Sequence, residues 1–102
     1  MIKLKLSQRL LTIADIITDN NKVIDVGCDH ADLDIFLALN RQNVYCIAVD
    51  NKENIVNNVR EKIKKYQLED KIKVYQTDGL ENIKIDDDSI IVISGLGTNT
   101  IL

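Results

Sequence analysis

The stretch VIDVGCDHADL, residues 23–33, decides the fold of this chain. Its apolar beginning predicts a buried strand over residues 22–26. Asp25, Val26 and Gly27 form an acid-x-Gly pattern at the end of this strand. A helix is predicted directly afterwards, over residues 31–40. A strand that turns through glycine into a helix aims backbone N–H groups at a ligand beyond the strand end. We therefore interpret the stretch as a cofactor-binding turn.

The sequence on either side continues the alternation of strands and helices. Apolar residues spaced by three and four predict two more helices, over residues 3–18 and 52–66. Apolar runs predict further strands over residues 44–49, 72–77 and 90–94. This order indicates a right-handed, mainly parallel α/β sheet behind an N-terminal helix. With 102 residues, the chain is at most one domain and is short for a complete α/β enzyme domain.

Composition excludes several classes of protein. The net charge of -3 argues against an autonomous nucleic-acid-binding domain, although an RNA-modifying enzyme with its basic surface elsewhere stays possible. Cys28 and Cys46 lack zinc-ligand spacing, so we expect reduced thiols and no metal. The sequence has no apolar run long enough for a membrane span, and we expect no secretory leader. We therefore expect a cytoplasmic protein without a membrane partner.

Three strand ends carry the functional signal: Asp25 to Gly27, Asp50, and Asp78 with Gly79. The carboxyl ends of parallel strands share one edge of the sheet, so these residues should meet in one crevice. Asp50 follows Gly27 by roughly twenty residues, which suits hydrogen bonds to two ribose hydroxyls. Asp78 is placed to accept a hydrogen bond from an adenine amino group.

The loop after the first strand separates two classes of cofactor. A dinucleotide-binding loop has a second glycine that makes room for the pyrophosphate, whereas Asp29 and His30 stand here. A carboxylate aimed at two phosphates is repelled, but one near the amino group or sulfonium of S-adenosylmethionine is attracted. The loop therefore favours S-adenosylmethionine over NAD.

Five segments resemble a known family, the bacterial tRNA adenine-N1 methyltransferases that modify adenine 22 of tRNA. They are LSQRLLTIADII (6–17), VIDVGCDHADL (23–33), VDN (49–51), TDGL (77–80) and ISGLG (93–97). The resemblance covers the whole chain, but only about the first half of a typical member. The chain departs from the family where Asp32-Leu33-Asp34 replaces Tyr-Leu-Pro, where Gly97-Thr98 replaces a glycine pair, and where Asp50 replaces a frequent glutamate.

The resemblance implies a Rossmann-like class I methyltransferase fold with an incomplete sheet of strand order 3-2-1-4. Residues 1–102 would form the N-terminal half of an S-adenosylmethionine-binding domain. The activity implied is methyl transfer from S-adenosylmethionine to N1 of an adenine in tRNA, with Asp29 as the catalytic residue that stabilises developing positive charge. The implied cofactor-binding residues are Arg9, Asp25, Gly27, Cys28, His30, Asp50, Asn51, Asp78, Gly79 and Ser94, and the implied substrate-binding residues are Gly95, Leu96 and Gly97.

The short chain leaves other functions open. In the family, tRNA is bound mainly by regions beyond these 102 residues, so we expect the isolated chain to be inactive. The alternatives are a class I methyltransferase with another substrate, and an inactive module that self-associates. The fourth strand would be an exposed apolar edge, and we expect homodimers to form through it.

Each candidate residue also has an ordinary structural interpretation. Asp29 would cap the helix that follows, His30 would be packed or capping, Cys28 would be a small loop residue, and Asp78-Gly79 would be a plain turn. Arg9 would be a solvated charge. The basic residues Arg60, Lys62, Lys64 and Lys65 would form the solvated face of a helix, with tRNA contact as the alternative.

Overall fold

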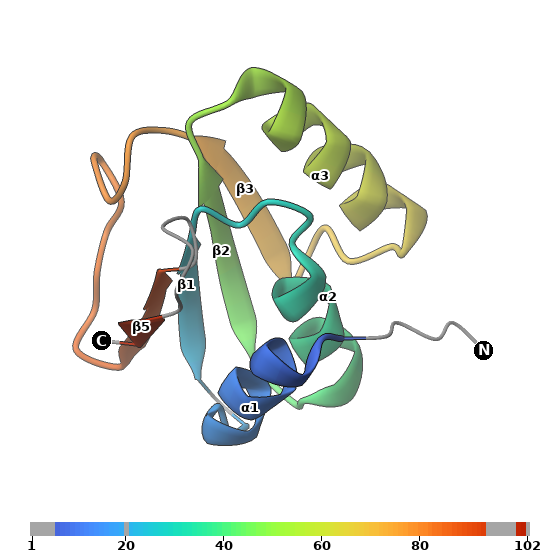
Figure 1. The fold of residues 1–102 in the computed structure, drawn as a ribbon, viewed down its shortest axis with the longest axis vertical. Coiled ribbons are helices and arrows are strands. Elements are labelled where there is room, and N and C mark those ends of the chain that lie inside the picture. Colours follow the sequence, from blue (N-terminus) through green and yellow to red (C-terminus); the bar gives the residue numbers. More distant parts are fainter. Residues whose placement is uncertain (1–5, 20, 94–99, 102) are drawn as a thin grey trace.

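The computed structural model describes residues 6–19, 21–93 and 100–101, and its elements alternate as the sequence predicts (Figure 1). The helices are α1 (Gln8–Ile16), α2 (Asp32–Asn40) and α3 (Glu53–Lys65). The strands are β1 (Lys22–Val26), β2 (Tyr45–Asp50), β3 (Ile72–Gln76), β4 (Ser89–Ile93) and β5 (Thr100–Ile101). The first helix is shorter than predicted because Ser7 is its N-cap, where the hydroxyl accepts a hydrogen bond from the Leu10 N–H at 3.3 Å.

The strands form one sheet of order β3-β2-β1-β4-β5. The first four are parallel to one another, which confirms the predicted order 3-2-1-4. A fifth strand, β5, is not predicted by the sequence; it runs antiparallel to β4 and pairs with Val92 and Ile93. The prediction that the fourth strand is the outermost strand is therefore wrong, since β5 covers its last two residues.

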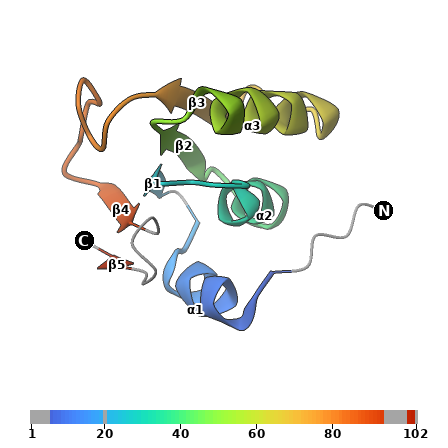
Figure 2. The same ribbon diagram turned by 45° about the horizontal axis from the view of Figure 1, so that its top comes forward.

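The helices all lie on one face of the sheet, as Figures 1 and 2 show from two directions. Alternate strand residues such as Val23 and Cys46 pack against them in the main core. On the other face, Ile24, Ile47 and Val49 form a second cluster against which residues of the β3–β4 connection pack, namely Leu80 and Ile83. Burial on both faces fixes β1 and β2, and with them the positions of their carboxyl ends.

Candidate functional site

The turn after β1 is tied to β2 by backbone hydrogen bonds. The N–H groups of Gly27 and Cys28 both donate to the Val49 carbonyl, at 2.8 and 3.0 Å. Gly27 has a φ of 71°, a left-handed conformation that glycine adopts without steric strain. The chain thereby leaves the sheet toward α2 and keeps the end of β1 open.

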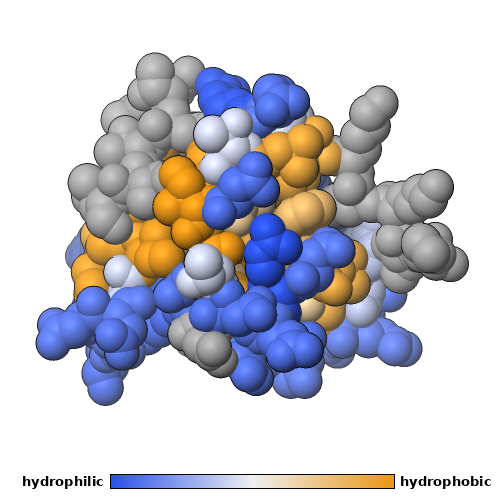
Figure 3. Space-filling view, turned by 90° about the horizontal axis from the view of Figure 1, so that it is seen from below, coloured by the Kyte–Doolittle hydropathy of each residue, from blue (hydrophilic) through white to orange (hydrophobic). Residues whose placement is uncertain are grey.

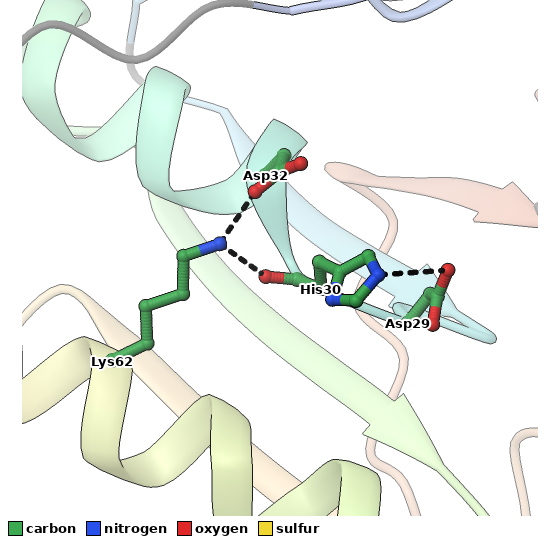
Figure 4. Close-up of polar contacts among 4 residues, drawn as sticks. All are labelled: Asp29, His30, Asp32 and Lys62. Carbon is green, nitrogen blue, oxygen red and sulfur yellow. Dashed lines mark hydrogen bonds and ion pairs between the residues drawn. The ribbon is translucent and has the colours of Figure 1, made fainter.

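Asp29 and His30 stand at the tip of this loop. Their side chains are 69% and 78% exposed respectively, and Asp29 Oδ2 lies 3.9 Å from His30 Nε2 (Figure 4). The N-cap of α2 is Ala31, which makes no side-chain cap hydrogen bond. The interpretation of Asp29 as a helix cap is therefore wrong, and so is that of His30 as a packed or capping imidazole.

The ends of β2 and β3 are linked to each other. Asp50 is largely buried, and its Oδ1 accepts a hydrogen bond from the Lys52 N–H at 3.0 Å. The Thr77 N–H donates to the Asp50 carbonyl at 3.0 Å, and the Asn51 amide donates to Asp78 Oδ1 at 3.4 Å. These bonds hold two carboxylates, Asp50 and Asp78, on the same edge of the sheet, as the sequence predicts.

Asp78 and Gly79 do form a turn, because the Glu81 N–H donates to the Asp78 carbonyl at 3.2 Å. Gly79 has a φ of 57°, and a Cβ built there would meet nothing within 4 Å. Its backbone conformation, not lack of space, is what favours glycine. Asp78 and Gly79 thus form a turn at the end of β3.

The strand ends enclose a cleft of about 530 Å³, within the range of small-molecule binding sites. Two smaller clefts adjoin it on the two sides of the loop, of about 160 and 310 Å³. Asp29 lines all three. The other residues around the 530 Å³ cleft are Val26, Gly27, Val49, Asp50, Asn51, Lys52, Ile55, Thr77, Asp78 and Gly79.

The 160 Å³ cleft brings α1 to the same site. Ser7, Arg9 and Leu10 line it together with Asp25, Cys28 and His30. Arg9, on α1, thus lies beside the loop, where the cofactor-binding role that the resemblance implies stays a prediction. Ser94, Gly95, Leu96 and Gly97 lie outside the described residues.

Asp25 faces a second buried acid, Asp34 of α2. Asp25 is 3% exposed and Asp34 is fully buried, and Asp25 Oδ1 and both Asp34 oxygens have no hydrogen-bond donor among the described groups. Burial raises the pKa of Asp25 to about 6 and raises the pKa of Asp34 well above its ordinary range. The raised pKa values indicate that the pair keeps a proton, which we place on Asp34 because its pKa is raised well above the ordinary range. In the sequence, Asp34 stands out only as a departure from the family pattern.

Both cysteines are buried free thiols. Burial raises the pKa of the Cys28 thiol, and the nearby carboxylates raise it further, Asp25 most of all. A protonated thiol is a poor nucleophile. Cys28 is therefore a small residue of the loop whose backbone shapes the turn.

Lys62 does not behave as a solvated residue. Its side chain is 29% exposed, and its Nζ donates to the His30 carbonyl at 3.0 Å and pairs with Asp32 Oδ1 at 2.5 Å. The solvated-face interpretation is therefore wrong for Lys62, whereas Arg60, Lys64 and Lys65 are exposed as predicted. The spacing of charges on α3 carries no signal of this contact, because its partners lie about thirty residues away.

Known proteins are similar to this chain in both sequence and fold. A curated relative, the tRNA (adenine(22)-N(1))-methyltransferase of Bacillus subtilis, is 36% identical over 97 residues, which cover 95% of this chain and 41% of the relative. The crystal structure of the B. subtilis tRNA methyltransferase TrmK matches with a TM-score of 0.82 and 35% identity, over 91% of this chain and 40% of that one. The predicted resemblance is confirmed.

A second solved structure, TrmK of M. capricolum in complex with S-adenosyl-homocysteine, matches with a TM-score of 0.78 and 29% identity. The match covers 88% of this chain and 41% of that one, so the chain spans about two fifths of the length of these relatives. Residues 6–102 also match the protein family described as Methyltransferase domain. By sequence and by fold, this chain belongs to that family of methyltransferase domains.

Proposed function

We propose that this chain is the cofactor-binding part of an S-adenosylmethionine-dependent methyltransferase that acts on N1 of an adenine in tRNA. The observation that carries the proposal is the convergence of Asp29, Asp50 and Asp78 on one cleft of about 530 Å³. The relative's activity and the S-adenosyl-homocysteine bound in the M. capricolum structure support the choice of substrate and cofactor.

The residues present fit the proposed cofactor. Asp50, fixed at the end of β2, would accept hydrogen bonds from the ribose hydroxyls, and Asp78 would accept one from the adenine amino group. Asp25 and Arg9 border the 160 Å³ cleft, where the amino-acid end would lie between a carboxylate and a guanidinium. Its ammonium and carboxylate groups would each have an opposite charge nearby.

When bound, S-adenosylmethionine supplies a methyl group on a positively charged sulfur. Adenine N1 carries its own lone pair, so the protein needs no covalent nucleophile and contributes orientation and electrostatic stabilisation. Asp29 is the candidate catalytic residue because its carboxylate stands where the clefts meet and can stabilise the positive charge that develops on the base. The target base would have to leave its stack to reach this position. Gly95, Leu96 and Gly97 are the residues we propose to hold it.

Titration of the chain with S-adenosylmethionine and, separately, with NAD tests the cofactor. We expect saturable calorimetric binding of S-adenosylmethionine at one site and no binding of NAD; the reverse preference, or no binding of either, would overturn the proposal. A second step tests the substrate. If the full-length protein binds the cofactor but forms no N1-methyladenosine in tRNA, another methyl acceptor is the better assignment.

We also propose that the protein works in the cytoplasm, where it would meet tRNA. None of the helices within the described parts of the chain is long and apolar enough to cross a membrane.

Homodimerisation of the isolated chain stays a prediction, and we now assign it to a shorter part of the β4 edge. Only Val92 and Ile93 of β4 pair with β5, so the first residues of the strand, Ser89 to Ile91, are the part of the edge that we expect to pair with another chain. Seen from the end where the strands begin, the surface shows a group of apolar residues bordered by hydrophilic ones (Figure 3). Sedimentation equilibrium should show dimers at high concentration, and a strictly monomeric chain would contradict the prediction.

A further inference from the structure

We propose that Lys62 is a positioning residue for the cofactor loop, which we define as residues 27–31. This inference rests on the proposed function, because it assumes that the loop contacts the cofactor. Lys62 lies near the end of α3, yet its ammonium group reaches the loop from the side. Figure 4 shows it between the His30 carbonyl, at 3.0 Å, and Asp32 Oδ1, at 2.5 Å.

This contact is better fixed than an ordinary surface ion pair. The Lys62 and Asp32 side chains are 29% and 33% exposed, so both charges are partly shielded from solvent. Asp32 is also in the first turn of α2, where a negative charge interacts favourably with the helix dipole. Lys62 thus holds the start of α2 and the loop at the same time.

The loop needs such support because of its backbone. Asp29 and Ala31 both have left-handed conformations, with φ of 52° and 55°. Residues other than glycine are strained in this region and stay there only when their surroundings hold them. The His30 carbonyl belongs to the peptide group that joins His30 to Ala31, so the bond from Lys62 fixes the orientation of that peptide. The Ala31 N–H, which donates to the Cys28 carbonyl at 2.8 Å, closes the loop from the other side.

The position of Asp29 is what Lys62 would control. Asp29 lines all three clefts at the strand ends, whereas Lys62 lines only the 310 Å³ cleft on the α3 side. Lys62 therefore acts on the 530 Å³ cleft through the loop and not by contact with its contents.

Replacement of the lysine tests the proposal. In Lys62→Met we expect binding of S-adenosyl-homocysteine to weaken by about tenfold, the effect typical of losing a charged hydrogen bond that orders a binding loop. Lys62→Arg should restore binding because a guanidinium can donate to both oxygens. Lys65→Met is the matched control: it removes the same charge from an exposed position on the same helix and should bind as the wild type does.

Two further readouts separate positioning from general stability. Binding is measured at a temperature where circular dichroism shows every variant folded, and amide hydrogen exchange is followed in the loop without any ligand. We expect faster exchange at Cys28 and Ala31 in Lys62→Met but not in Lys65→Met. Asp32→Asn should give a smaller loss of affinity than Lys62→Met. The double variant should bind no more weakly than Lys62→Met, because both substitutions remove the same Lys62–Asp32 ion pair.

The possible failures can be told apart. A wild-type chain that binds no S-adenosyl-homocysteine overturns the proposed function, and loop exchange then decides whether Lys62 holds the loop. A wild-type chain that binds, beside a Lys62→Met variant with unchanged affinity and unchanged loop exchange, overturns the role of Lys62 alone.

Discussion

At the scale of single residues, acids placed at strand ends account for the proposed specificity. Asp50 and Asp78 could be found from the sequence because each directly follows an apolar run, and a parallel sheet brings such positions together. Whether Asp29 caps a helix or faces the cleft could not be decided in this way, and the contact of Lys62 could not be found. A helix cap and a loop carboxylate look the same in sequence, and the lysine contact depends on how α3 packs beside the loop.

Replacing Asp50 should remove the anchor for the ribose. We expect Asp50→Ala to weaken S-adenosylmethionine binding by about tenfold to a hundredfold, because a charge-assisted hydrogen bond contributes about 1.5–3 kcal/mol. Isothermal titration calorimetry measures the change. Asp87→Ala, an exposed acid in the β3–β4 connection, is the control and should bind normally. Equal affinities for Asp50→Ala and the wild type would rule out this role.

The buried pair of Asp25 and Asp34 should make stability depend on pH. The pKa of Asp25 rises from its ordinary value of 3.8 to about 6 in the folded chain, mainly through burial. Between these values the folded chain binds more protons than the unfolded chain, so the free energy of unfolding falls as the pH rises. The pKa of Asp34 is also raised well above its ordinary range, mainly through burial, so the fall should continue above pH 6.

The Asp34→Asn variant tests this account of the pair. Its amide can donate to Asp25 without losing a proton, so the fall in stability with pH should be shallower. At pH 8 the variant should be more stable than the wild type by at least about 1 kcal/mol, since one pKa unit corresponds to about 1.4 kcal/mol. Urea unfolding from pH 5 to pH 8 measures the difference, with the exposed Asp15→Asn as the control for loss of a charge. Parallel curves for Asp34→Asn and the wild type would contradict the shared proton.

At the scale of elements, periodicity predicted each helix but not where each one begins. Apolar spacing shows which residues face the core, while the first residue of a helix is set by its cap. Ser7, itself in an extended conformation, caps the start of α1, and Ala31 starts α2 without any side-chain cap. The strand β5 has only two residues, too few for any pattern, and forms because β4 offers it an open edge.

The N-cap of α1 should contribute measurably to stability. We expect Ser7→Ala to lower the free energy of unfolding by about 1 kcal/mol, the usual loss when a capping hydroxyl is removed. Thr12→Ala removes a hydroxyl from the middle of the same helix and should change stability little, because alanine is the better helix former. Thermal unfolding compares the two. If Thr12→Ala were as destabilising as Ser7→Ala, the cap would not be the reason.

At the scale of the whole molecule, strand order was predictable because a parallel sheet with right-handed crossovers permits few arrangements. The residues that cover the sheet face opposite the helices were not predictable. Leu80 and Ile83 come from an irregular connection whose sequence shows no periodicity, and they pack on Ile24, Ile47 and Val49 only once the sheet exists. The same holds for the site. The positions of its strand-end residues follow from strand order, whereas the conformation of its loop depends on tertiary contacts that the sequence does not show.

The central claim is that three strand ends of this chain form one cofactor site. Nuclear magnetic resonance of the ¹⁵N-labelled chain during titration with S-adenosyl-homocysteine tests it most directly. We predict saturable shifts of the backbone amides of Gly27, Asp29, Asp50 and Asp78, and unchanged signals at the far end of the sheet, for example at Leu39 and Lys71. Shifts confined to the far end, or no shifts in a folded chain, would contradict the claim.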